Sequence, residues 1–248
     1  MAISVDTVYQ RVLAILNKEQ RGYLTPVEFN LLANQAQMSI FEQYFNDISQ
    51  FSRVPGNDTE FSDSLENLHE KIEFFQKEGN MTYSADTAVG GWTMPLNMYK
   101  AGKIYIAATG KPRVPVQKVT KKDYELLITS PLMKPTDKSP IAYSYIITSG
   151  STQVYATKIH AADLLNSITG DVKINYISKP AQVSWGYSTV LGEALYNANN
   201  SVDFELHATE ETKLVIKVLE LAGLLIQDIG TYQVADKEDK QKTQQEKS

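Results

Sequence analysis

Residues 25–49, TPVEFNLLANQAQMSIFEQYFNDIS, decide the helical part of the fold. Thr25 is followed three residues later by Glu28, which forms a capping box, and Pro26 occupies the first helical position, where a missing backbone N–H costs nothing. Apolar residues then recur at helical spacing, at Phe29, Leu32, Ala33, Ala36, Ile40 and Tyr44. This pattern predicts a long helix from Pro26 to about Ser49.

The remaining faces of this helix carry amide side chains and no Lys or Arg. Helix faces that meet only water usually carry charges of both signs, so an amide-rich face favours contact with another polar surface. A merely solvated amide face is the alternative. We therefore take Asn30, Asn34 and Gln37 as candidate interaction residues.

The chain returns to helix after Phe204, with Thr209 as the expected cap and Glu210 and Glu211 in the first turn. The apolar side of this helix supplies four further candidate interaction residues, Leu214, Val218, Leu221 and Leu225. Two more helices are expected, over residues 4–19 and over about 58–77, the second closed by Gly79 and Asn80.

Residues 81–203 change to a period of two, which predicts strands. Val172, Ile174 and Tyr176 alternate with more polar neighbours, as do several earlier runs. Ser149, Gly150 and Ser151 stand between two such runs and predict a hairpin. Thr120 and Asp123 predict the cap of one short inserted helix, residues 121–128.

These patterns predict an α+β fold in which a helical bundle from the N-terminal and C-terminal helices carries an inserted β-rich domain. The expected division is a helical part over 1–79, a β-rich part over 80–204, a helix over 205–232 that returns to the helical part, and a tail over 233–248. The tail has balanced charge and almost no apolar residues, so we expect it to be disordered or ordered only by a partner.

Composition restricts the function. The 248 residues contain no cysteine, which excludes disulfides and thiolate chemistry, and the net charge of −5 argues against a surface built to attract phosphates. We find no export signal and no run of about 18 apolar residues that could span a membrane, so we expect synthesis in the cytoplasm and no membrane contact.

The chain offers little for catalysis. Its three histidines, His69, His160 and His207, lack the spacing of a helical metal pair. The stretch 108–112, ATGKP, resembles a phosphate loop but has proline where the magnesium-binding hydroxyl belongs. We expect no catalytic, cofactor or metal site, and no enzyme.

Several segments together resemble virion structural proteins of short-tailed bacteriophages, including crAss-like and related marine phages. They are residues 8–23, then LTPVEFNLLANQAQMSIFEQYF at 24–45, VTKKDYELLITSPL at 119–132, VKINYISKPAQVSWGY at 172–187 and VDFELHATEETKLVIKVLELAGLLI at 202–226. These segments follow one another in the right order between residues 8 and 226, and none of them is a catalytic motif.

This resemblance implies a head-to-tail connector, or adaptor: a ring below the portal, often of twelve copies, that joins the DNA-filled head to the tail. The implied partners are copies of the chain, the portal protein and other tail proteins, with DNA passing through without specific binding, and the implied location is the head-tail junction of the virion. Two alternatives stay open. One is another tail or head-associated structural protein, and the other is a glycan-binding tail module that uses the aromatic-rich β region.

Overall fold

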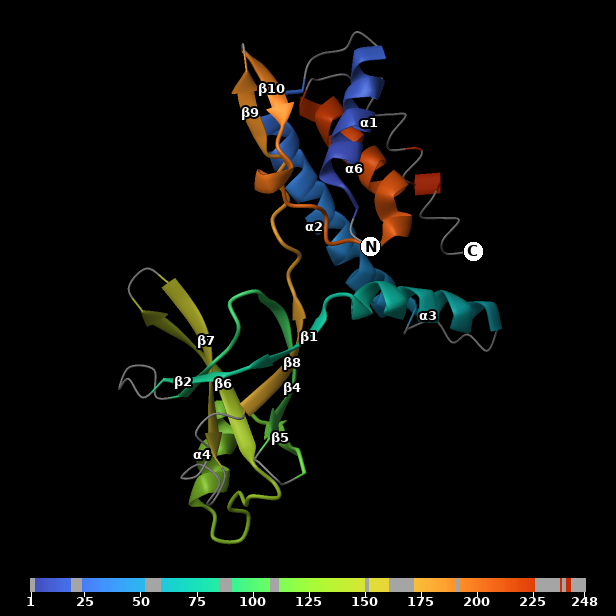
Figure 1. Ribbon diagram of the computed structural model, residues 1–248. Coiled ribbons are helices and arrows are strands. Elements are labelled where there is room, and N and C mark those ends of the chain that lie inside the picture. The colour runs from blue at the N-terminus through green and yellow to red at the C-terminus, as the bar shows by residue number, and fades with distance from the viewer. Residues whose placement is uncertain are drawn as a thin grey trace. The chain divides into compact units, whose positions relative to one another are not determined.

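A computed structural model describes residues 3–18, 24–51, 59–84, 91–107, 112–149, 152–160, 172–190, 192–225, 237 and 240–241 (Figure 1). The chain forms two compact units. The first comprises Met1–Phe74 together with Pro180–Ser248, and the second comprises Phe75–Lys179. The expected boundaries lay at 79/80 and 204/205, whereas the boundaries in the structure lie at 74/75 and 179/180. Most of the tail over 233–248 lies outside the described residues.

The first unit contains most of the helices. Its elements are α1 (Val5–Lys18), α2 (Pro26–Phe51), α3 (Thr59–Glu73), the hairpin strands β9 (Tyr187–Val190) and β10 (Glu193–Tyr196), the short 3-10 turns η1 (Ala198–Asn200) and η2 (Ala208–Glu210), and α6 (Glu211–Leu225). Helices α1 and α2 both pack against α6. Their shared core includes Val8, Val12, Phe29, Phe41, Phe204, Leu206, Leu214 and Val218, each at most 1% exposed.

The capping box that starts α2 is confirmed. The Thr25 N–H donates to Oε2 of Glu28 at 2.9 Å, and the Glu28 N–H donates to Oγ1 of Thr25 at 3.3 Å. The Thr25 hydroxyl also donates to Oε2 of Glu28 at 2.6 Å, and this bond, followed by the one from the Thr25 N–H, lowers the pKa of the Glu28 carboxyl because both favour the ionised form.

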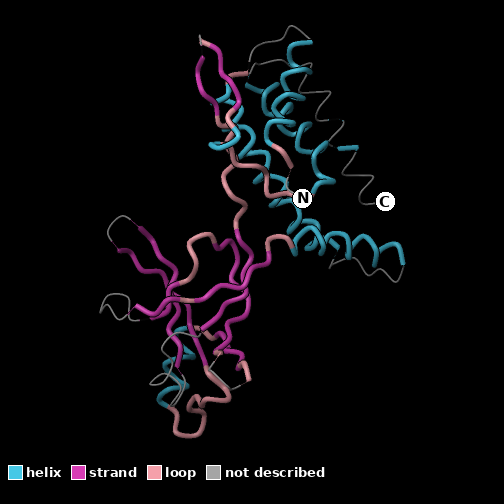
Figure 2. Tube along the Cα trace, in the orientation of Figure 1, coloured by secondary structure: helices cyan, strands magenta, loops and turns pink. Residues whose placement is uncertain are grey.

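The second unit is built on one eight-stranded sheet (Figure 2). Its strands are β1 (Gln76–Asn80), β2 (Thr82–Ser84), β3 (Gly91–Thr93), β4 (Met98–Ile106), β5 (Val114–Lys118), β6 (Ile141–Ser149), β7 (Thr152–His160) and β8 (Val172–Ser178). The order across the sheet is β1-β8-β4-β5-β6-β7-β3-β2, and every described pair is antiparallel except β5 with β6.

The sheet curls until its two edges come together. Strands β1 and β2 lie at opposite ends of the order, yet only Met81 separates them in the sequence. A flat sheet of eight strands would hold its edges more than 30 Å apart at the usual strand spacing of about 4.8 Å. One residue cannot span that distance, so the sheet is a nearly closed barrel with a corner at Met81.

The interior of this barrel is the core of the second unit. Met81, Trp92, Ile106, Ala142, Ile159 and Ile174 are all at most 5% exposed and form one hydrophobic cluster with their neighbours. Along β8, buried and more exposed residues alternate, which confirms the period predicted at Val172, Ile174 and Tyr176. The predicted hairpin around residue 150 is also confirmed, because β6 and β7 pair from Ile141 with His160 to Ser149 with Thr152.

The expected fold class, a helical bundle with an inserted β-rich domain, is wrong. The nearly closed eight-stranded sheet is the principal element of the structure. The helices of the first unit do not close into a bundle either, because the polar face of α2 is covered by the extended residues 181–185 and not by another helix. Helical periodicity identifies an apolar stripe but not the type of element that covers the opposite face.

Two local predictions were also wrong. Helix α3 ends at Glu73, and Gln76–Asn80, expected to continue and close that helix, is the strand β1. The strand is polar because it is an exposed edge, and a Cβ at Gly79 would lie 3.0 Å from Cε1 of Tyr176, so this glycine permits close packing and does not end a helix. At the return to helix, the predicted cap Thr209 lies within the 3-10 turn η2, whose own N-cap is His207, and α6 begins at Glu211.

Candidate interaction surfaces

The amide face of α2 contacts the chain's own extended segment 181–185. Asn34 donates from Nδ2 to the Val183 carbonyl at 2.8 Å and accepts from the Val183 N–H at 2.8 Å. Asn30 accepts from the Trp185 N–H at 2.7 Å and donates to the Trp185 carbonyl at 3.4 Å. Each side chain thus binds both polar groups of one backbone residue, as a neighbouring strand would.

Gln37 continues this contact. It donates from Nε2 to the Ala181 carbonyl at 2.8 Å and accepts from the Glu205 N–H at 3.2 Å, and its side chain is buried. Positions 30, 34 and 37 share one helix face, and residues 181, 183 and 185 share one side of an extended chain, so the two repeats match. The polar surface that the sequence analysis expected opposite these amides is therefore contained within one chain.

The four candidate residues of α6 occupy different environments. Leu214 and Val218 are fully buried in the core of the first unit. Leu221 is half-buried, and the side chain of Leu225 lies outside the described residues. These residues serve the packing of their own unit, as far as the structure describes them.

An aromatic cluster fixes the hairpin β9–β10 to the first unit. The indole of Trp185 stacks on Tyr187, with ring centroids 5.9 Å apart. The Trp185 ring centroid also lies 5.7 Å from that of Tyr196 and 4.4 Å from that of Tyr9 in α1. The Trp185 Nε1–H donates to Asp6 at 2.9 Å. The base of the hairpin is therefore anchored both by stacking and by a hydrogen bond.

The hairpin itself is exposed. Within the described residues its two strands pair with each other and with no third strand, and among their eight residues Glu193 is the one that carries a charge. Val190 is 48% exposed and Leu195 is 55% exposed. Gly192 closes the turn at a φ of 92°, a conformation that favours glycine. Both outer strand edges and several apolar side chains are thus open to a partner.

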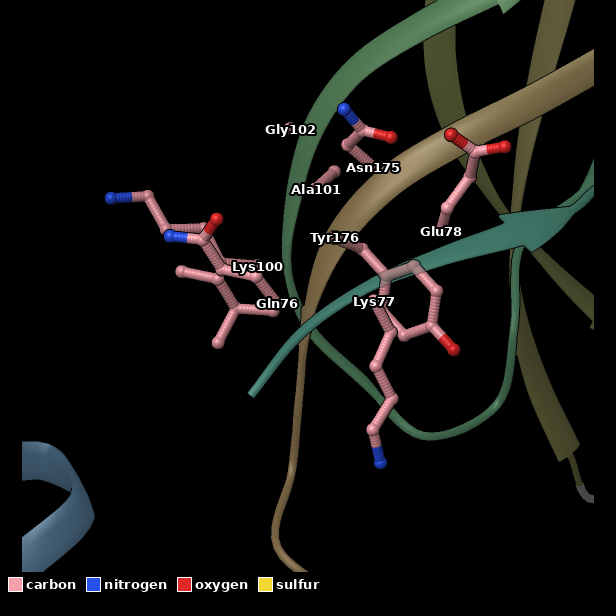
Figure 3. Close-up of a pocket in the computed structure, with 9 residues that line it drawn as sticks. Gln76, Lys77, Glu78, Lys100, Ala101, Gly102, Asn175 and Tyr176 are labelled. Atoms are coloured by element: carbon pink, nitrogen blue, oxygen red, sulfur yellow. The ribbon is translucent and has the colours of Figure 1, made fainter. Parts of the chain in front are cut away.

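A second exposed region surrounds a bulge in β4. The pairing of β4 with β8 shifts register between Ala101 and Ile104, and a Cβ at Gly102 would lie 2.6 Å from the Asn175 carbonyl oxygen. The bulge leaves an open hollow of about 460 Å³ (Figure 3). It is lined by residues of β1, β4 and β8, including Gln76, Glu78, Lys100, Gly102, Asn175 and Tyr176.

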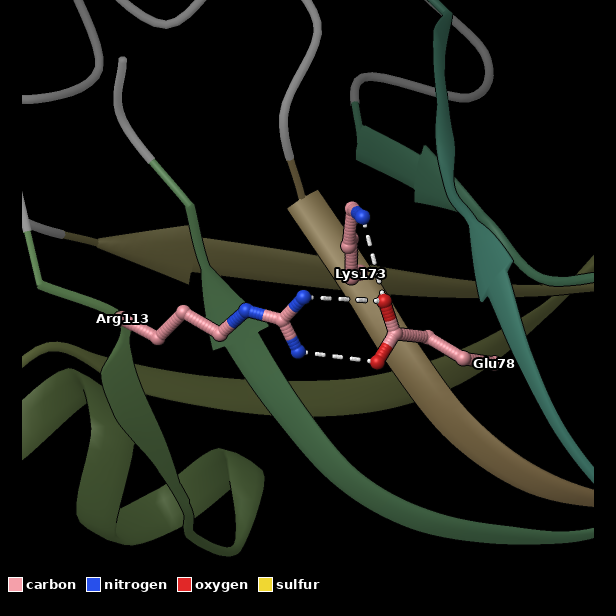
Figure 4. A network of polar contacts seen from close by, with 3 residues as sticks. All are labelled: Glu78, Arg113 and Lys173. Carbon is pink, nitrogen blue, oxygen red and sulfur yellow. Dashed lines mark hydrogen bonds and ion pairs between the residues drawn. The ribbon is translucent and has the colours of Figure 1, made fainter. Parts of the chain in front are cut away.

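Beside this hollow, one carboxylate joins three strands (Figure 4). Arg113, just before β5, donates to both oxygens of Glu78 at 2.9 and 3.3 Å, and Lys173 of β8 lies 3.1 Å from Oε1. The hydrogen bonds from Lys173 and then Arg113 lower the pKa of the Glu78 carboxyl. The Glu78 side chain is 38% exposed, so water screens these bonds and their main effect is to fix the positions of the two cations.

Charge is divided unequally between the two units. Residues 75–179 contain 13 Lys and Arg and 7 Asp and Glu, which gives the second unit a net charge of +6. The rest of the chain contains 11 Lys and Arg and 22 Asp and Glu, which gives −11. The whole-chain value of −5 conceals this separation. A charge count for each predicted domain would have revealed it.

Comparison with known proteins does not assign the chain to a family, because no family model and no curated protein matches it. Within the described residues, no group of three or more His, Cys, Asp or Glu side chains is placed to hold a metal ion. In that same part of the chain, no helix has the length and apolar character needed to cross a membrane.

Proposed function

We propose that this chain is a structural, non-enzymatic subunit of a bacteriophage particle, which forms a ring that joins the portal of the DNA-filled head to the tail. The resemblance of five segments to virion proteins of short-tailed phages supports the phage assignment. The exposed hairpin β9–β10 is the observation that carries the assembly function. The ring belongs at the head-tail junction, with the portal and other tail proteins as partners.

The hairpin has the properties of an assembly element. Monomeric proteins usually protect strand edges with Lys, Pro or a covering element, because unpaired backbone N–H and C=O groups recruit other strands. None of these protections lies within β9 or β10, and the one charged residue there is Glu193 at the turn. An isolated two-stranded hairpin is also marginally stable in water, so this one gains stability when a third strand or an apolar surface joins it.

The anchored base makes the hairpin suitable for specific assembly. Stacking of Trp185 on Tyr187 and Tyr196 fixes the strands relative to α1 and α2. A neighbouring copy that pairs with a hairpin edge would therefore be held at a defined angle. A contact between two different surfaces of identical subunits, repeated at one angle, closes into a ring when the rotation permits.

The absolute mass of the purified protein, alone and mixed with a candidate portal ring, tests this proposal. We expect rings or stoichiometric portal complexes by native mass spectrometry. The double variant Val190→Lys and Leu195→Lys should lose assembly while its circular dichroism stays unchanged. The matched control is Val27→Lys with Leu31→Lys, which changes the same residue types at sites on α2 that are 57% and 69% exposed.

The outcomes separate the parts of the proposal. A wild-type protein that stays monomeric and ignores the portal would overturn the ring function. If the protein assembles but the hairpin variant assembles equally well, the hairpin is not the contact. Equal loss in the control would mean that added charge alone prevents assembly.

A further inference from the structure

The outer face of the strands β1, β8, β4 and β5 carries a second set of exposed groups. Along β8, Val172, Ile174 and Tyr176 point into the barrel, so Lys173 and Asn175 point outward. The register places Tyr105 of β4 beside Lys173. We use the name basic sheet face for Lys100, Lys103, Tyr105, Arg113, Lys173 and Asn175.

The basic sheet face has excess positive charge. It holds four cations, and Glu78 neutralises one of them through its bonds to Arg113 and Lys173. Lys100 and Lys103 are exposed on β4, and neither has an ion pair among the described residues. A second hollow, of about 170 Å³, has Gly102 and Lys103 on its lining together with the core residues Met94, Ile104 and Ala142. Lys100 and Lys103 thus stand within two residues of Gly102.

The same face offers contacts other than charge. Tyr105 is half-buried, so one part of its ring remains open, and it lies between Lys173 on β8 and Pro115 on β5. Asn175 is exposed and can donate or accept a hydrogen bond. The hollow at the bulge has Gly102, Lys100 and Asn175 on its lining, so a ligand seated there would lie beside a cation and an amide. Lysines, an open aromatic ring and amides on a curved sheet are the groups that bind single-stranded nucleic acids.

We propose that the basic sheet face binds a single-stranded polynucleotide, with its phosphates on Lys100, Lys103, Arg113 and Lys173 and one base stacked on Tyr105. Contacts to phosphates and an aromatic ring do not read base edges, so binding is independent of sequence. The site lies within the second unit, whose net charge is +6. This site uses different residues from those of the hairpin β9–β10, and the proposal does not depend on the phage assignment.

Fluorescence anisotropy of labelled oligothymidylate and oligouridylate, each about 30 nucleotides long, tests the site with the full-length protein. The four cations less Glu78 leave a net charge of +3, which predicts that log K falls with log salt with a slope of about −2, at about −0.7 per phosphate for single strands. The two labelled probes distinguish DNA from RNA, and either satisfies the proposal. A labelled polyglutamate is the third probe, because it carries negative charge without phosphates or bases.

Two variants and one matched control locate the contacts. Lys100→Glu with Lys103→Glu should weaken binding at least about tenfold and reduce the salt slope by about 1.4. Tyr105→Leu should weaken binding about tenfold and leave the slope unchanged, because stacking is not ionic. The control, Lys134→Glu with Lys138→Glu, makes the same change in charge at exposed sites of the same unit and should change affinity less than about threefold.

Three results would overturn the proposal. They are the absence of salt-dependent binding to either oligonucleotide, equal weakening by the control pair, and equal affinity for polyglutamate. The last would identify an acidic protein surface as the better ligand. Circular dichroism and the fluorescence of the buried Trp92 verify that each variant folds. Because monomers suffice for this assay, failure here leaves the ring function untouched, and failure to form rings leaves this site untouched.

Discussion

Replacement of Asn34 by Leu should strongly destabilise the first unit. The side chain makes three hydrogen bonds, to the Val183 carbonyl at 2.8 Å, from the Val183 N–H at 2.8 Å and to the Asn30 carbonyl at 2.7 Å. Leucine has a similar volume and high helix propensity, so α2 itself should tolerate the change. The loss therefore falls on the contact between α2 and residues 181–185.

The magnitude follows from the burial of the partner. Val183 is 2% exposed, so water cannot easily replace the bonds that the amide makes to its backbone. A buried N–H or carbonyl without a partner costs about 1 to 3 kcal/mol, so two such groups give a loss of about 2 to 6 kcal/mol. Domains of this size are stable by about 5 to 15 kcal/mol, so the variant should be folded but much weaker.

Urea denaturation followed by tryptophan fluorescence measures this loss. The two tryptophans lie in different units, so replacement of Trp92 by Phe leaves Trp185 as the reporter of the first unit. With an m value of about 2 to 3 kcal/mol/M, the midpoint should fall by about 1 to 3 M. The matched control is Gln35→Leu, the same kind of replacement at the next residue, which is exposed. Equal midpoints for the two variants would refute the reasoning that the amide supports the buried segment.

Three further predictions concern the second unit. Gly102→Ala should destabilise it by about 1 to 3 kcal/mol in urea, because the new Cβ would lie 2.6 Å from the Asn175 carbonyl oxygen; an unchanged midpoint would mean that the bulge relaxes easily. In the folded protein the pKa of Glu78 is lowered from 4.5, so its bonds stabilise the fold fully above pH 4.5 and are lost as the pH falls through the pKa of the folded state. Glu78→Gln should remove this acid dependence from the free energy of unfolding measured between about pH 6 and about pH 3. Burial, and then the neighbouring Tyr143 and Tyr145, raise the pKa of Tyr124 to about 12. Since the unfolded chain ionises near pH 10, stability should fall between about pH 10 and about pH 12, and Tyr124→Phe should flatten that fall in alkaline denaturation curves.

The local patterns of α2 were predictable because they depend on residues close in sequence. The capping box of Thr25 and Glu28 and the apolar stripe from Phe29 to Tyr44 need only helical geometry. The partner of the amide face was not predictable in the same way. Nothing within α2 indicates that Val183, 149 residues from Asn34, supplies the backbone that the amide binds.

The edge strand β1 was not predicted from the sequence, for a related reason. Gln76–Asn80 has no alternating apolar residues because both of its faces are exposed, so its strand conformation comes from pairing with β8. The basic sheet face was hidden in another way. Its cations come from separate parts of the chain, and they lie together only after β4 pairs with β8 and with β5.

The sequence by itself determined the helical starts, the alternation along β8, the β6–β7 hairpin and the absence of thiol chemistry. These depend on residue type and on spacing over a few positions, which backbone geometry fixes locally. Tertiary structure decided the closure of the sheet at Met81, the enclosure of the amide face and the gathering of cations on the basic sheet face. Those features depend on contacts between residues far apart in the chain, and a local pattern of side chains does not specify which distant segment will fill a surface.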